Sequence, residues 1–134
     1  MSAVRLVRSN GLAPAPYAYA SRVESGTELI FLAGACPLAD DGSTVAVGDV
    51  AGQARRCVAN MLVALDAAGA DLEDVASTRI LVASSERRDL VAAWDVVSTA
   101  SGEHDVPSTL MGVTVLGYED QLVEVEVVAA VRRG

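Results

Sequence analysis

The residues near the end of the chain alternate strictly between two faces, which is the pattern of a β-strand. One face of this predicted strand, over residues 122–131, would carry only apolar side chains: Val123, Val125, Val127, Ala129 and Val131. Such a face is expected to pack on a core. The other face would carry two glutamates among apolar residues: Leu122, Glu124, Glu126, Val128 and Ala130. Because apolar groups on a second face need covering, we predict a homo-oligomer.

Two upstream segments have the pattern of amphipathic helices. Asp49 is a suitable N-cap for a helix that runs to about Ala68, and Gly69 supplies its end. Six apolar residues share one face at helical spacing: Val50, Ala54, Cys57, Met61, Leu62 and Leu65. Three polar residues lie elsewhere on this helix: Gln53, Arg56 and Asn60. Ser85 is expected to cap a second helix that contains Trp94 and ends at Gly102.

Short β-branched and apolar runs predict the remaining strands, over residues 4–7, 18–24, 28–33, 75–83 and 108–116. The Ser25-Gly26 pair predicts a tight turn, so we expect the second and third strands to form a hairpin. The resulting order is β-β-β-α-β-α-β-β. It indicates an α+β fold in a single domain over residues 1–134, with two helices on one face of one mixed sheet.

The charge balance disfavours nucleic acid as a partner. The chain of 134 residues has 18 acidic residues against 10 basic ones, all of them arginine, and a formal net charge of −8. Binding to a phosphate backbone needs clustered positive charge, and 4% aromatic residues give few surfaces for stacking bases. No apolar run approaches the ~18 residues of a membrane helix, and the first ten residues do not resemble a signal peptide. We therefore expect a soluble, cytoplasmic protein that contacts neither membrane nor nucleic acid.

Residues that bind metals are scarce. His104 is the only histidine, and Cys36 and Cys57 are the only cysteines. No CxxC or HExxH motif is present, so we predict no metal site. A Ser-His-Asp triad would depend on His104, which we interpret as a surface or capping residue. We interpret the two cysteines as buried thiols.

Several ordered segments together resemble one known family. They are residues 13–17 (APAPY), 31–38 (FLAGACPL), 49–61 with Gln53 and Asn60, 67–75 (AAGADLEDV) and 123–126 (VEVE). In this order and spacing they resemble the RidA/YjgF family of reactive intermediate deaminases, also called the endoribonuclease L-PSP family. The resemblance implies a chorismate mutase-like fold and a homotrimer with small-molecule clefts between neighbouring subunits. It also implies hydrolysis of enamines and imines without a metal or an organic cofactor.

The resemblance also suggests roles for individual residues. Tyr17 matches a tyrosine of the cleft, Gly34 a glycine where the backbone meets the ligand, and Glu124 a glutamate that positions or activates water. The family's catalytic arginine falls on Thr109 when the chain is counted without gaps from Pro107 to Glu124. A guanidinium grips a carboxylate through two charge-assisted hydrogen bonds, whereas threonine offers one neutral hydroxyl. The chain thus resembles family members that lack the arginine.

Two classes of function stay open. The first is an enzyme for metal-free hydrolysis (deamination) or tautomerisation of a small imine or enamine that is not a simple amino-acid-derived carboxylate. Glu124 would be its catalytic residue, and Tyr17, Gly34 and Thr109 would bind the substrate. The second is a trimer that binds or senses a small apolar metabolite without turning it over. Ribonuclease activity is disfavoured by the acidic charge and by the absence of a histidine pair.

Two further points stay open at this stage. A glutamate on a strand is usually solvent-facing, and Glu126 in particular is better interpreted as part of the trimer axis or of a water network. An arginine other than the missing one could also serve the cleft. Arg22 and Arg79 lie on predicted strands, but the sequence does not say whether either reaches it.

Overall fold

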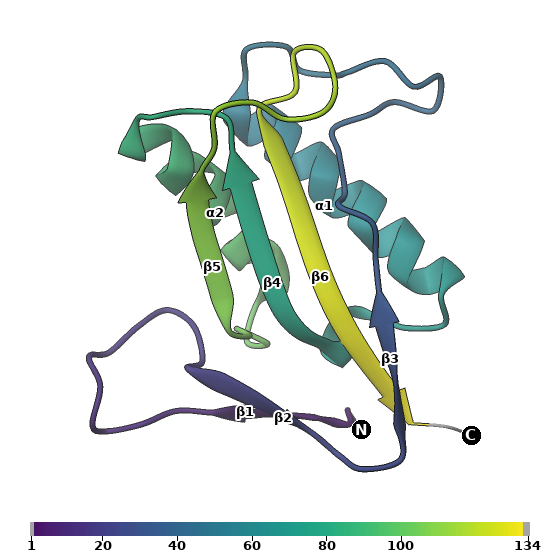
Figure 1. Ribbon diagram of the computed structural model, residues 1–134, viewed down its shortest axis with the longest axis vertical. Coiled ribbons are helices and arrows are strands. Elements are labelled where there is room, and N and C mark those ends of the chain that lie inside the picture. Colours follow the sequence, from purple (N-terminus) through teal and green to yellow (C-terminus); the bar gives the residue numbers. More distant parts are fainter. Residues whose placement is uncertain (1, 133–134) are drawn as a thin grey trace.

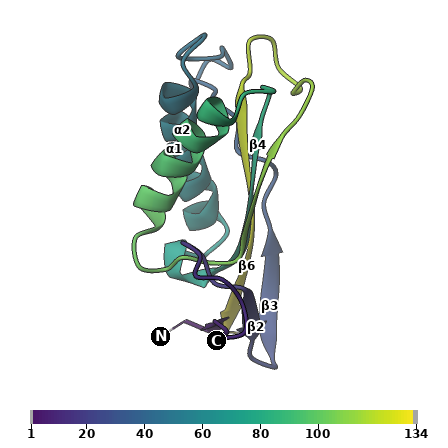
Figure 2. The ribbon, with the colours of Figure 1, turned by 90° about the vertical axis from the view of Figure 1, so that its left-hand side faces the viewer.

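The computed structural model describes residues 2–132 and has the predicted order of helices and strands. In chain order the elements are β1 (Val4–Val7), β2 (Ala20–Val23), β3 (Thr27–Phe31), α1 (Val50–Ala67), the 3-10 helix η1 (Leu72–Asp74), β4 (Val75–Val82), α2 (Arg87–Ser101), β5 (Ser108–Gly112) and β6 (Val123–Arg132). Four of the strands form one sheet, shown face-on in Figure 1. Figure 2 shows α1 and α2 together on one side of that sheet. The predicted α+β class is confirmed.

The four-stranded sheet is mixed, with the order β3-β6-β4-β5. β4 and β5 are parallel and are joined by α2, whereas β6 runs antiparallel to both β3 and β4. The long strand β6 therefore lies between two partners, and residues that face each other across strands share one face of the sheet.

The expected hairpin of the second and third strands is wrong. A turn does occur at Gly26, whose φ is +80°. The chain changes direction there, however, because β2 pairs with β1 and β3 pairs with β6. β3 brings Leu29 and Phe31 opposite Ala130 and Val128, which are apolar cross-strand pairs, whereas the centre of β2 carries the polar residues Ser21 and Arg22. β1 and β2 consequently form a separate two-stranded ribbon rather than part of the main sheet.

The core lies between the helices and the apolar face of β6. Four alternate residues of β6 are at most 3% exposed: Val123, Val125, Val127 and Ala129. They pack with the predicted inner face of α1, including Cys57 and Leu65, both with no exposed surface. Leu62 is 41% exposed, because the buried stripe of α1 takes in Gln53 and Val58 instead.

The ends of the helices follow local capping. The side chain of Asp49 accepts a hydrogen bond from the Gly52 N–H at 3.0 Å, as predicted for the start of α1. α2 begins one residue later than expected, with Glu86 at its N-cap. Ser84 rather than Ser85 stabilises this start, because its hydroxyl accepts from the Glu86 N–H and donates to Asp89. Within residues 2–132 no helix is long and apolar enough to cross a membrane.

The sheet face opposite the helices, which we call the open face, is covered only at one end by the chain itself. Ala130 has no exposed surface because Val4 and Ala76 pack on it, so this residue does not need a second chain as the sequence suggested. Leu29 and Phe31 on β3 are 54% and 72% exposed. The open face thus keeps uncovered apolar surface along its β3 edge.

Candidate functional site

Glu124 lies on the open face near the start of β6. Its neighbours Val123 and Val125 are buried on the helix side, so alternation directs the glutamate side chain to the opposite side. Leu81 of β4 is its cross-strand neighbour, and Met111 of β5 lies next in the same row. The carboxylate therefore adjoins half-buried apolar side chains.

Gly34 and Glu124 are brought into direct contact. Beyond the end of β3, the backbone of Ala35 exchanges two hydrogen bonds with Val125, at 2.7 and 3.0 Å. This bridge sets Gly34 beside Glu124. A Cβ at position 34 would lie 2.5 Å from both Cδ and Oε2 of Glu124, so only glycine leaves room for the carboxyl group in this position.

Two side chains hold one oxygen of the Glu124 carboxylate. The Cys36 thiol lies 3.3 Å from Oε1, and Nε2 of Gln121 donates to the same oxygen at 3.4 Å. No hydrogen bond to Oε2 is found among residues 2–132. Gln121 is 4% exposed and is itself fixed, because it accepts from the Tyr118 N–H and donates to the Val123 carbonyl.

The Cys36 thiol stays protonated near neutral pH. Burial, together with the hydrogen bond and negative charge of Glu124, raises the pKa of Cys36 to about 11. The interpretation of both cysteines as buried thiols holds for Cys57, whereas Cys36 is only half-buried. The neighbour of Cys36 is a carboxylate rather than a cation, so nothing here lowers the pKa of its thiol toward that of a reactive cysteine. The protonated thiol can donate to Oε1.

The polar side of α1 fixes the two loops that carry these donors. Asn60 donates to the carbonyls of Cys36 and Leu38, at 2.9 and 3.0 Å. Gln53, fully buried, donates to the Asp120 carbonyl at 2.9 Å and accepts from the Leu122 N–H at 2.7 Å. These hydrogen bonds therefore fix the loop that carries Cys36 and the turn that carries Gln121, which lie beside Glu124.

Thr109 lies in the row of the open face next to that of Glu124. This row runs from Glu126 on β6 through Arg79 on β4 to Thr109 on β5. Nη1 of Arg79 is 3.7 Å from Oε1 of Glu126. Thr109 is exposed, and with two strand spacings between them its backbone lies about 10 Å from β6. Arg79 therefore reaches the open face beside Thr109, whereas Arg22 lies on the β1–β2 ribbon opposite Arg5.

Tyr17 is not brought to Glu124 within one chain. Its ring contacts Trp94 of α2 edge-on, with centroids 6.1 Å apart, and Tyr19 at 5.7 Å. α2 covers the helix side of the sheet (Figure 2). Alternation along β6 directs Glu124 to the opposite, open face, because its neighbours Val123 and Val125 are buried on the helix side. Tyr17 and Tyr19 also line a hollow of about 420 Å³ in the loop between β1 and β2.

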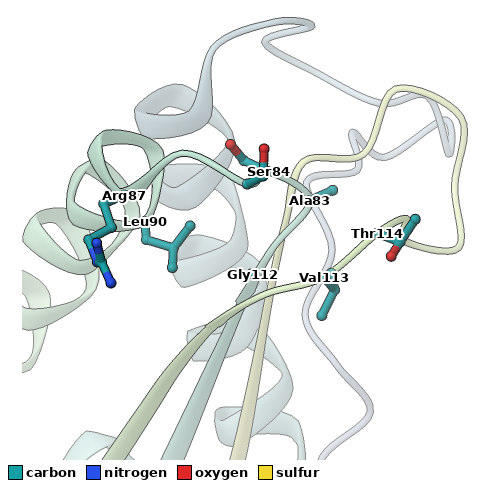
Figure 3. Close-up of a pocket in the computed structure, with 8 residues that line it drawn as sticks. Ala83, Ser84, Arg87, Leu90, Gly112, Val113 and Thr114 are labelled. Carbon is teal, nitrogen blue, oxygen red and sulfur yellow. The ribbon is translucent and has the colours of Figure 1, made fainter.

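A larger cavity lies at the carboxyl ends of β4 and β5. It has a volume of about 920 Å³ and contains none of the predicted site residues. Figure 3 shows Arg87 and Leu90 of α2 on one side of it and Gly112 to Thr114 on the other. The sequence analysis missed this cavity, because it forms where two distant loops diverge.

Sequence reasoning also missed the partners of Glu124. The sequence analysis did not identify Gln121. The available signal was its place in the turn just before the last strand, where a polar side chain that becomes buried needs hydrogen-bond partners. Across residues 2–132, no three histidine, cysteine, aspartate or glutamate side chains are grouped so that they could hold a metal ion.

Comparison with known proteins shows the family and the fold of the chain. A family model described as endoribonuclease L-PSP matches residues 10–131. A RutC family protein of Pyrococcus abyssi is 30% identical over 114 residues, which covers 85% of each chain. Among solved structures, YyfB of the Rid protein family from Yersinia pestis, a protein of unknown function, matches with a TM-score of 0.87 at 24% identity, over 96% of this chain and 99% of that one.

A second structure matches at higher identity. A member of the YjgF/YER057c/UK114 family from Mycobacterium tuberculosis has a TM-score of 0.64 and is 28% identical, over 96% of this chain and 99% of that one. The predicted chorismate mutase-like fold is therefore confirmed. The chain belongs to the endoribonuclease L-PSP family, the family of the RidA and YjgF proteins.

Proposed function

We propose that this protein is a homotrimer that hydrolyses or tautomerises a small imine or enamine at Glu124, without a metal or other cofactor. The observation that carries the proposal is a carboxylate held over Gly34 on an open sheet face, with Oε1 hydrogen-bonded and Oε2 without a hydrogen bond from any of residues 2–132. A positioned carboxylate with a free oxygen is suited to general acid–base catalysis.

The chemistry needs only water and this carboxylate. Glu124 takes a proton from water as the water oxygen adds to the imine carbon and returns it to the nitrogen, which gives a neutral carbinolamine. The carboxylate then takes the proton of the carbinolamine hydroxyl and passes it to the nitrogen as the C–N bond breaks, so a carbonyl compound and ammonia leave and the carboxylate is regenerated. An enamine is first protonated at carbon to give the imine, which is the tautomerisation step.

The substrate class follows from the residues around the carboxylate. Thr109, which falls where the family resemblance places its arginine, offers no cation. The guanidinium beside it, Arg79, faces the carboxylate of Glu126 at 3.7 Å. Leu81 and Met111 extend the row of Glu124 with apolar surface. We infer a compound that is not a simple amino-acid-derived carboxylate.

The trimer is supported by the apolar surface of the open face. Leu29 and Phe31 expose more than half of their surface beside the half-buried Val128. Large exposed apolar patches mark interaction surfaces, and a second copy of the chain is the partner that the family resemblance implies. Assembly would also supply the missing wall of the site, since Tyr17 lies on the other side of the sheet.

A second candidate is a trimer that binds or senses a small apolar metabolite without turnover. The apolar neighbours of Glu124 favour it, because they would suit a ligand with no reactive C–N bond. The family's older name refers to RNA cleavage, but the net charge of −8 disfavours RNA as the ligand.

The test of the proposed function is a ligand screen by thermal shift, followed by turnover assays on the hits. Glu124→Gln keeps the shape and removes the base, so turnover of a true substrate should fall by about 10²- to 10⁴-fold. Glu126→Gln on the same strand is the matched control and should retain most of the activity. Ligand binding without turnover in the natural protein would support the sensing trimer instead. Turnover at the normal rate by Glu124→Gln would make Glu124 a structural residue.

A further inference from the structure

The two oxygens of the Glu124 carboxylate have different surroundings. Oε1 faces two donors, the thiol of Cys36 at 3.3 Å and the amide of Gln121 at 3.4 Å. Oε2 lies against Gly34, within 2.5 Å of where a Cβ would stand, and no hydrogen bond to it is found among residues 2–132. A carboxylate held by one oxygen can turn only about that anchor, so the direction of the other oxygen is restricted.

We propose that Cys36 is a positioning residue, whose thiol acts with the Gln121 amide to hold Oε1 and so presents Oε2 as the oxygen that exchanges the proton. This inference rests on the proposed role of Glu124 and adds to it the division of labour between its oxygens. It also gives a function to a cysteine that the sequence alone presents as a small buried hydrophobic residue.

The Cys36 thiol is expected to donate its hydrogen bond to the Glu124 carboxylate rather than to the Gly34 carbonyl, its other possible acceptor. Its sulfur lies 3.4 Å from the Gly34 carbonyl and 3.3 Å from Oε1, but it has a single hydrogen to donate. Hydrogen bonds to an ionised acceptor are about twice as strong as those between neutral groups. The proton is therefore expected to point at Glu124.

The backbone on which the thiol stands is rigid. The Cys36 carbonyl accepts from Asn60 at 2.9 Å and from the Leu38 N–H at 2.8 Å. Pro37, which is fully buried, follows directly and fixes the chain there. The donor thus has little freedom to move away from Oε1.

The contact can be tested without a substrate, through the reaction of Cys36 with iodoacetamide. Cys57 has no exposed surface, and Cys57→Ala leaves Cys36 as the only thiol. Because only the thiolate reacts and its pKa is about 11, the rate should rise about tenfold per pH unit from about pH 7 to pH 10.

Glu124→Gln in the same background removes the charge that opposes ionisation of the thiol. The pKa of Cys36 should then fall, although burial keeps it above that of a free cysteine, and the rate at pH 8 should rise about tenfold for each unit of the fall. Glu126→Gln is the matched control, because it removes an equal charge two residues away and should leave the rate unchanged. An equal rate in Glu124→Gln and the control would overturn the contact, and with it the proposal.

Crystal structures of two Cys36 variants test the positioning itself. Cys36→Ser keeps a donor and should keep the Glu124 carboxyl in one orientation, whereas Cys36→Ala should let it adopt several. A single unchanged orientation in Cys36→Ala would show that the thiol is dispensable for positioning. Both tests are separate from the turnover of Glu124→Gln, so failure of the proposed function can be told apart from failure of this inference.

Discussion

Replacing Gly34 with alanine should separate the position of Glu124 from the stability of the fold. The added methyl group would lie 2.5 Å from Cδ and Oε2 of Glu124, and ordinary contact begins at 3.4 Å. The carboxyl group must therefore move by about 0.9 Å. It can do so, because it is the far end of a flexible side chain and the open face gives it room.

Gly34→Ala should lower the free energy of unfolding only slightly. Glu124 loses its hydrogen bonds to Cys36 and Gln121, each worth about 1 kcal/mol after exchange with water. Gly34 does not have a positive φ, so alanine fits its backbone and contributes about 0.4–1 kcal/mol by restricting the unfolded chain. We expect a net loss of about 1 kcal/mol, which lowers Tm by about 4 °C in a domain of this size.

The effect of Gly34→Ala on the rate of the proposed reaction should be large. A displacement of about 1 Å in a catalytic group can reduce the rate by about 10²-fold. Displacement of the carboxylate also moves its negative charge away from Cys36, so the pKa of that thiol should fall. Its alkylation at pH 8 should therefore be faster.

Circular dichroism melting and iodoacetamide kinetics, both in the Cys57→Ala background, measure the two effects. Gly117→Ala is the matched control, because a Cβ at that position in the nearby turn would meet no atom within 4 Å. A Gly34→Ala protein with the alkylation profile of this control would refute the packing of Glu124 over Gly34. A loss of stability well above the expected value would show that the glycine serves the fold instead.

Three further predictions concern the substrate, the assembly and metals. Thr109→Arg should increase hydrolysis of 2-iminopropionate by about tenfold or more in an ammonia-release assay, because a guanidinium can bind the carboxylate of this substrate. If the natural protein already hydrolyses 2-iminopropionate as fast as arginine-bearing relatives do, the assignment of Thr109 is wrong. Phe31→Asp should turn a trimer into smaller species in light scattering, because a charge would replace 72%-exposed apolar surface at the proposed interface; a natural protein that is already monomeric at micromolar concentration would refute the trimer. Turnover of a substrate found by the screen should survive dialysis against a chelator, because residues 2–132 hold no cluster of metal ligands; loss restored by a stoichiometric metal would contradict this.

The fold could be predicted largely because its signals are local. The alternation in β6 gave the core face correctly, and Asp49 marked the start of α1. The partner of β3 could not be predicted in this way. A Ser25-Gly26 pair says that the chain turns, but the choice between β2 and a strand a hundred residues later depends on which apolar surfaces match.

The site shows the same division between local and distant signals. The contact of Gly34 with Glu124 joins residues 90 positions apart, and only the family resemblance named both. Cys36 was interpreted only as a buried thiol and Gln121 was not identified, since each is a single residue in a loop whose partner is fixed by the tertiary structure. The polar residues Gln53 and Asn60 were visible on the helix, but nothing in the sequence showed which loops they hold.

The positions of Tyr17 and Glu124 link function to assembly and allow a last test. One lies beside α2 and the other on the opposite face of the sheet, so a single chain cannot place both against one ligand. In a cyclic trimer each site would instead combine Glu124 of one subunit with Tyr17 of its neighbour.

Tyr17→Ala and Glu124→Gln should each be inactive alone on a substrate that the screen provides. After the two are mixed in equal amounts, dissociated and reassembled, about one quarter of the sites should be intact, because each needs two independent subunits of the right kind. No recovery in trimers shown by mass spectrometry to be mixed would mean that the two residues do not act in a shared site.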